Sequence, residues 1–123
     1  MISITKTFEF DAAHKLLYHK GKCCNLHGHR FVLEVEITGL IQTEGSSMGM
    51  ITDYGDLKKI VNEEIIDSLD HAYLNDVCDF YPTSEMLVNS IRNKLLVVLE
   101  KQDIALLRIR LYETPTSWAE WRK

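Results

Sequence analysis

The sequence lacks the long apolar run and the basic cluster that direct a protein to a membrane or to nucleic acid. No apolar stretch approaches the roughly 20 residues of a transmembrane helix, and residues 1–7 lack the apolar segment of a signal peptide. The 14 Lys and Arg residues are interspersed with 18 Asp and Glu residues, which gives a formal net charge of −4. We therefore expect neither a nucleic-acid nor a membrane partner.

Cysteine is scarce, and its three residues do not suit a disulfide framework. The count is odd, Cys23 and Cys24 are adjacent, and Cys78 is far from both. Small disulfide-stapled domains usually carry an even number of spaced cysteines. We therefore expect reduced thiols and a cytoplasmic protein. The length of 123 residues predicts a single domain over residues 1–123.

Apolar residues recur with strand spacing in four segments and with helical spacing in two. The predicted strands cover residues 2–11, 29–41, 104–113 and 117–122. Asp53 and Thr83 have the character of helix N-caps, and the apolar stripes behind them predict helices over residues 54–68 and 84–100. Residues 15–25 and 72–82 are expected to be loops. In the third strand, Leu107, Ile109 and Leu111 are expected to face the core.

The order of these elements predicts an α+β fold. Two helices between two pairs of strands can cover one face of a four-stranded antiparallel sheet. The helix-free face would carry Glu34 and Glu36 beside Arg108 and Arg110, and these opposite charges could pair across strands.

A His-Gly-His sequence at residues 27–29 is the strongest chemical signal in the chain. Residues two apart on a strand point to the same side, so His27 and His29 could aim both imidazoles at one ion. A catalytic zinc ion typically takes three protein ligands, and His14, at the end of the first predicted strand, is the best third candidate. The alternative is that the pair contributes only surface polarity.

Three further features could carry chemistry. Cys23, four residues before His27, could be a thiolate base, but it could equally be a packed thiol or a fourth zinc ligand. Asp70 and His71 could form an acid/base pair, or simply polar residues at a helix end. Glu113 could grip a planar amidine or guanidine through two hydrogen bonds, although solvation of a strand end explains it as well.

Several motifs, in this order and spacing, resemble the 6-pyruvoyl-tetrahydropterin synthase superfamily, and within it the 6-carboxytetrahydropterin synthase branch of queuosine biosynthesis. The placement of Cys23 four residues before His27 is similar to the carboxy-forming branch, whereas Cys24 and Tyr54 depart from the family pattern. The motifs are Phe10–Leu16, Cys23–His29, Gly49–Tyr54, Leu69–His71, Leu74-Asn75, Pro82–Glu85 and Glu113-Thr114.

The resemblance implies a tunnelling fold (ββααββ), in which the sheets of several protomers join into a β-barrel. It implies a trimer-based homo-oligomer, a hexamer, with active sites at subunit interfaces. The residue roles that it implies are zinc binding by His14, His27 and His29, proton abstraction by Cys23, acid/base catalysis by Asp70 and His71, and pterin anchoring by Glu113. Glu85 and Thr83 match a neighbouring pterin-contact motif, although either could simply cap a helix.

The reaction implied is that of a zinc-dependent lyase acting on 7,8-dihydroneopterin triphosphate. Its products would be 6-carboxy-5,6,7,8-tetrahydropterin, acetaldehyde and triphosphate. The alternatives are the pyruvoyl-forming reaction of the sister branch, a related aldolase-type cleavage of dihydroneopterin, and a non-catalytic zinc or pterin-binding module.

Overall fold

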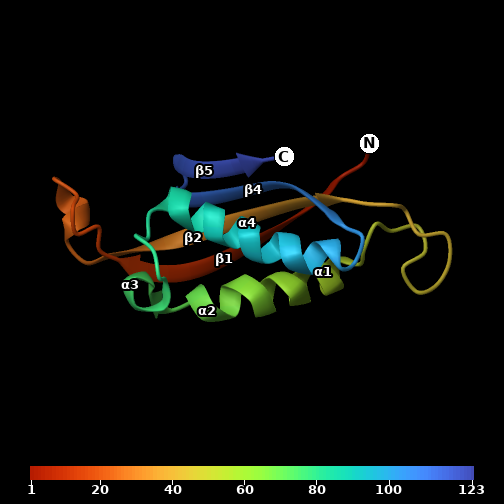
Figure 1. The fold of residues 1–123 in the computed structure, drawn as a ribbon, viewed down its shortest axis with the longest axis horizontal. Coiled ribbons are helices and arrows are strands. Elements are labelled where there is room, and N and C mark those ends of the chain that lie inside the picture. The colour runs from red at the N-terminus through yellow and green to blue at the C-terminus, as the bar shows by residue number, and fades with distance from the viewer.

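Five strands form one mixed sheet in the computed structural model, which describes residues 1–123 (Figure 1). The strand order is β3-β1-β2-β4-β5. β3 runs parallel to β1, and all other neighbours are antiparallel. The α+β fold is confirmed, but the prediction of four strands is wrong, because the short β3 forms in a segment expected to be loop. The strands are β1 (Ile4–His14), β2 (His27–Thr38), β3 (Ala72–Tyr73), β4 (Ala105–Thr114) and β5 (Ser117–Arg122).

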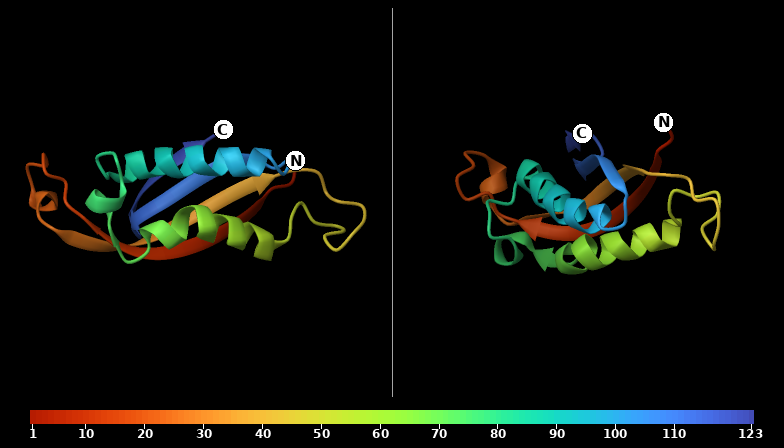
Figure 2. Two further views of the ribbon diagram at one scale, coloured as in Figure 1. Left: turned by 60° about the horizontal axis from the view of Figure 1, so that its bottom comes forward. Right: turned by 45° about the vertical axis from the view of Figure 1, so that its right-hand side comes forward.

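The two long helical segments lie together on one face of this sheet (Figure 2). The first runs from α1 (Tyr54–Val61) through a π-helical segment, Asn62–Ile66, into α2 (Asp67–Leu69), close to the predicted range. The second is α4 (Ser84–Glu100), as predicted. A four-residue helix, α3 (Leu74–Val77), lies between them in sequence. None of these helices combines the length and apolarity needed to cross a membrane.

The helix-covered face of the sheet carries the core. Alternate residues of the strands, such as Phe10 of β1 and Leu33 of β2, meet Leu57 and Leu95 of the helices in one cluster of 22 buried residues. The prediction that Leu107 faces this core is wrong. A bulge shifts the register between Glu36 and Ile37 of β2, so that Leu106 is buried and Leu107 is only half-buried.

The opposite face of the sheet is charged, and its ion pairs cross the strands as expected. Arg108 donates from Nε to Glu36 and from Nη1 to Glu34, at 2.9 Å in each case. Arg110 pairs instead with Glu120 of β5, at 2.7 Å. The sheet is open in one chain, with β5 at one edge and β3, which pairs only with two residues of β1, at the other.

Candidate active site

Three histidine side chains converge at the end of the β1–β2 hairpin. The register places His14, the last residue of β1, opposite His27, the first residue of β2. His29, two residues further along β2, faces the same side as His27. The ring centroids lie 4.5 Å apart for His14 and His27, 4.9 Å for His27 and His29, and 5.3 Å for His14 and His29. One ring nitrogen from each histidine lies within 4.8 Å of the other two.

Two of these imidazoles are oriented by backbone carbonyl groups. His14 Nδ1 lies 2.8 Å from the carbonyl oxygen of Pro82, and His27 Nδ1 lies 2.8 Å from that of Asn25. A carbonyl oxygen can only accept a hydrogen bond, so both Nδ1 atoms carry the proton. In a neutral ring with this tautomer, Nε2 presents a lone pair, and the two Nε2 atoms face each other at 2.9 Å. Two lone pairs at this distance repel unless a proton or a metal cation lies between them.

The third imidazole is half-buried, and its inward nitrogen is buried without a hydrogen-bond partner. His29 Nε2 makes no hydrogen bond, although a Glu113 carboxylate oxygen lies 3.5 Å away. Burial lowers the pKa of His29, and the attraction of Glu113 offsets this only in part. This lowered pKa favours the neutral ring, which is the form that binds metals. This donor set fits a divalent ion that prefers imidazole, such as zinc.

Cys23 lies in the loop between β1 and β2, outside the histidine cluster. It is half-buried in the 3-10 turn Lys22–Cys24 and forms no disulfide. Its sulfur does not lie within 4.8 Å of all three histidine nitrogens, so it does not complete a four-ligand site with them. A tetrahedral ion held by three imidazoles keeps one position for water or substrate, which is the arrangement of catalytic rather than structural zinc.

Asp70 and His71 contact each other beside β1. Asp70 Oδ1 accepts a hydrogen bond from the backbone N–H of Asp11 at 3.0 Å and lies 3.1 Å from His71 Nδ1. The Asp11 N–H and, to a smaller extent, His71 hold the pKa of Asp70 below its ordinary value. His71 has a φ of 60°, which lies in the left-handed region. Strained backbone conformations of this kind are often found at functional sites. A carboxylate therefore orients this imidazole, but the ring is 80% exposed and stands apart from the histidine cluster.

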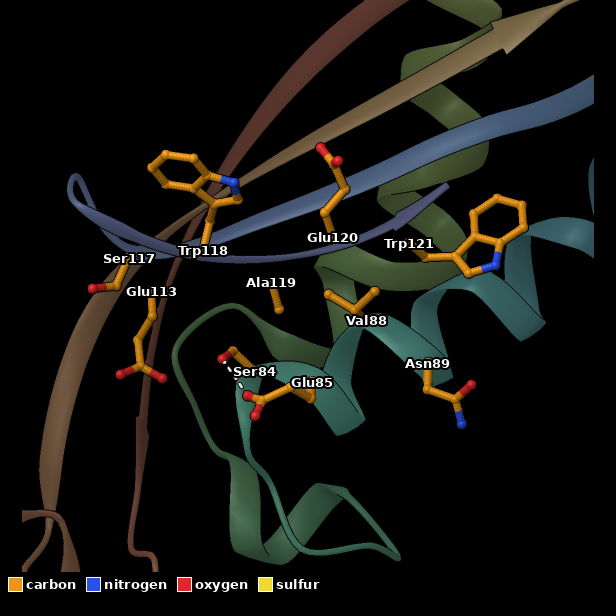
Figure 3. Close-up of a pocket in the computed structure, with 10 residues that line it drawn as sticks. All are labelled: Ser84, Glu85, Val88, Asn89, Glu113, Ser117, Trp118, Ala119, Glu120 and Trp121. Atoms are coloured by element: carbon orange, nitrogen blue, oxygen red, sulfur yellow. Dashed lines mark hydrogen bonds between the residues drawn. The ribbon is translucent and has the colours of Figure 1, made fainter. Parts of the chain in front are cut away.

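A pocket of about 590 Å³ opens between the N-terminal end of α4 and β5 (Figure 3). Glu113 and Glu85 both line it, and Ser84 donates a hydrogen bond to Glu85 at 3.0 Å. Thr83 does not line the pocket, because its hydroxyl caps α4 by accepting from the Met86 N–H at 3.2 Å. Glu120 also lines the pocket, but its carboxylate is paired with Arg110, so Glu113 and Glu85 are the two carboxylates that suit a ligand with several N–H donors.

Comparison with known proteins identifies the family. A profile of 6-pyruvoyl tetrahydropterin synthase matches residues 3–123. The chain belongs to the 6-pyruvoyl tetrahydropterin synthase family.

Relatives within this family match over almost the whole chain. The 6-carboxy-5,6,7,8-tetrahydropterin synthase of Haemophilus influenzae is 36% identical, with all of both chains covered. That of Synechocystis sp. is 39% identical over 96% of this chain and 91% of the relative. The solved structure of 6-pyruvoyl tetrahydropterin synthase from Caenorhabditis elegans superposes with a TM-score of 0.83 at 27% identity, covering 99% of this chain and 95% of the other.

The sequence patterns did not reveal the backbone groups that orient the histidine side chains of the site. The carbonyl groups of Asn25 and Pro82 set the tautomers of two histidines, yet any residue type supplies a carbonyl, so no sequence signal marks them. Asn75 was recognised only as part of a motif, and the structure shows its side chain bonded to the backbone of Lys15. Its polar side chain directly after the buried Leu74 is a weak signal that could have suggested such a contact.

Proposed function

We propose that this chain is a zinc-dependent lyase of queuosine biosynthesis. It would convert 7,8-dihydroneopterin triphosphate and water into 6-carboxy-5,6,7,8-tetrahydropterin, acetaldehyde and triphosphate. The observation that carries the proposal is the convergence of His14, His27 and His29, because the Nε2 atoms of His14 and His27 face each other and that of His29 has no hydrogen-bond partner. The names of the Haemophilus influenzae and Synechocystis sp. relatives support the carboxy-forming reaction.

His14, His27 and His29 would hold the zinc ion. When bound, zinc supplies a positive charge that polarises the hydroxyl groups of the substrate side chain and acidifies the neighbouring C–H bonds. Cys23, as a thiolate, would remove a proton from the side-chain carbon next to the pterin ring. His71, oriented by Asp70, would donate and accept protons as the side chain is cleaved and triphosphate leaves.

Glu113 would anchor the pterin ring. Its carboxylate can accept two parallel hydrogen bonds from the amino and ring N–H groups of a pterin. One of its oxygens is 3.5 Å from His29, so the anchor lies next to the metal-binding residues. Glu85 adds a second carboxylate from the facing helix. We give Thr83 only an indirect role at this site. Its hydroxyl caps α4, which fixes the start of the helix and so the position of Glu85.

The proposal includes assembly into a trimer-based hexamer with active sites between subunits. Exposure of the His71 ring and its separation from the histidine cluster support this, because an acid/base group must reach the substrate. The single domain over residues 1–123 would act in the cytoplasm, where its three free cysteines would remain reduced.

Product analysis tests the proposed reaction. Purified protein loaded with zinc is incubated with 7,8-dihydroneopterin triphosphate, and the products are identified by mass spectrometry. We expect 6-carboxytetrahydropterin and acetaldehyde. A pyruvoyl pterin would assign the chain to the sister reaction, and release of glycolaldehyde from unphosphorylated 7,8-dihydroneopterin in a parallel incubation would indicate aldolase-type cleavage. Pterin binding without any product would favour a non-catalytic module.

A further inference from the structure

The loop that carries Cys23 is tied at its base to a side chain from a distant segment. Asn75 Oδ1 accepts a hydrogen bond from the backbone N–H of Lys15 at 2.9 Å, and Asn75 Nδ2 donates to the carbonyl oxygen of Lys15 at 2.9 Å. Lys15 directly follows His14, so this two-way bond lies at the point where the chain leaves the histidine cluster and enters the loop. It holds both backbone groups of that residue.

From this anchored residue, the hydrogen bonds continue to Cys23. The N–H of Leu16 donates to the carbonyl oxygen of Cys23 at 2.9 Å, which closes the loop over residues 16–23. The Asn75 side chain is hydrogen-bonded to Lys15, and Leu16, the next residue in the chain, is hydrogen-bonded to Cys23. The position of Cys23 relative to His14 therefore depends on the Asn75 bonds through only two backbone units.

Asn75 also lies on the segment that carries the acid/base pair. The N–H of His71 donates to the carbonyl oxygen of Asp11, and the two residues of β3 pair in parallel with Ala12 and Ala13 of β1. Asn75, in α3, makes the last contact of this series. Residues 70–75 thus run alongside residues 11–15. These contacts fix the position of Asp70 and His71 relative to Lys15, where the cysteine loop begins.

We propose that Asn75 is a positioning residue that sets the place of Cys23 relative to the three histidines. The inference rests on the proposed function, in which Cys23 removes the proton. A carboxamide has the acceptor and the donor that the two Lys15 groups require, whereas a carboxylate offers only acceptors. Misplacement of a reacting group by about 1 Å can reduce the rate roughly 100-fold. We expect loss of the Asn75 bonds to reduce kcat about 10- to 100-fold with little change in KM or zinc content.

The test compares Asn75→Ala and Asn75→Asp with wild type and with the control Asp76→Ala. Asp76 is the next residue of α3, is exposed and makes no side-chain hydrogen bond, so its removal leaves the loop untouched. Amide hydrogen exchange of the 15–25 loop, zinc content, kcat and KM are measured on each protein. Asn75→Asp keeps the shape of the side chain but replaces the donor with a charged acceptor, so it tests the bond to the Lys15 carbonyl even if Asn75→Ala does not fold.

In both Asn75 variants we expect faster exchange in the 15–25 loop, unchanged exchange in β2 and the stated loss of kcat, with Asp76→Ala like wild type. Unchanged loop exchange, or faster exchange with normal kcat, would overturn the inference. So would loss of zinc in parallel with activity, since Asn75 would then support the histidines rather than Cys23. Failure of the proposed function is distinguishable from failure of this inference. If the proposed function is wrong, wild type forms no carboxypterin, whereas hydrogen exchange reports the effect of the Asn75 bonds on the loop without any need for turnover.

Discussion

Protonation of individual ring nitrogens decides what the histidine cluster can bind. The carbonyl groups of Asn25 and Pro82 accept hydrogen bonds from Nδ1 of two rings, and partial burial lowers the pKa of His29, which favours its uncharged form. Outer hydrogen bonds of this kind fix ring orientation and raise the basicity of a metal ligand. The ring orientations are therefore set by hydrogen bonds on the outer side of the cluster, which turn the Nε2 atoms of His14 and His27 toward each other.

Replacement of His29 by alanine tests this organisation. We expect the zinc affinity of His29→Ala to fall by more than the roughly 10- to 100-fold that loss of an outer-shell partner costs, because a direct ligand is removed. Zinc per chain after dialysis, measured by inductively coupled plasma mass spectrometry, checks it. His19→Ala is the matched control, since His19 is an exposed loop residue whose side chain accepts a hydrogen bond only from the Gly21 N–H. Equal zinc loss in both variants would contradict the assignment.

The lowered pKa of Asp70 predicts a pH dependence of stability. A carboxylate whose pKa is lower in the folded than in the unfolded protein stabilises the fold above its unfolded pKa of about 3.9. That stabilisation is lost as the pH falls through the folded pKa. We therefore expect Asp70→Asn to melt below wild type at pH 7 and the two melting temperatures to approach each other towards pH 3.

Thermal melts over this pH range, with Asp76→Asn as the exposed control, check the expectation. A difference between Asp70→Asn and wild type that stays constant from pH 7 to pH 3 would show that the charge of Asp70 contributes nothing. A difference of the same size in Asp76→Asn would show the same, because that carboxylate makes no hydrogen bond.

At the scale of secondary-structure elements, local signals predicted the long helices and main strands. Thr83 accepts a hydrogen bond from the α4 backbone, and Asp53 does the same for α1, so caps visible in the sequence mark where both helices begin. The phase of β4 was predicted incorrectly at Leu107, because a bulge in pairing with β2 leaves no mark in strand periodicity. The two-residue β3 depends on a neighbour 60 residues away and carries no periodic pattern.

The packing of α4 gives a prediction at this scale. Leu95 is completely buried between α4 and the sheet, so Leu95→Ala should lower the free energy of unfolding by about 2–5 kcal/mol. Val97 lies on the same helix with 57% of its surface exposed, and Val97→Ala should change it by at most about 0.5 kcal/mol. Urea denaturation of both variants checks the difference. Equal losses would contradict the assigned face of the helix.

Long-range pairing explains why the site was only partly predictable. The spacing of His27 and His29 follows from strand geometry, and the structure places them with His14 as that geometry suggested. Whether Asp70 would meet His71 depended on the backbone of Asp11 and on a positive φ, neither of which the dipeptide reveals. The tie between Asn75 and Lys15 likewise needed the chain to be folded.

At the scale of the whole molecule, the sheet has one helix-covered face and one charged face, and its edges are free. Arg108 is only 12% exposed although it lies on the helix-free face, because Glu34, Glu36 and Glu120 surround it. The edge of β1 that faces away from β2 is unpaired over residues 4–10, and so is the outer edge of β5. Unpaired edges readily take up strands of another chain, so the sheet is suited to joining copies of itself.

Native mass spectrometry tests this assembly. We expect the protein at micromolar concentration to form a closed homo-oligomer with a subunit number divisible by three, since the proposed barrel is built from trimers. Small-angle scattering at the same concentration provides an independent measure of size. A monomer by both methods would contradict assembly through the sheet edges and would leave the exposed His71 ring without a route to a neighbouring site.

The most direct test of the account is the zinc content of Cys23→Ala, measured on the same sample as product formation. We predict as much zinc per chain as in wild type, because three histidines hold the ion, and no 6-carboxytetrahydropterin, because the base is gone. Loss of zinc together with activity would make Cys23 a fourth ligand of a closed structural site, and normal product formation would remove it from the chemistry.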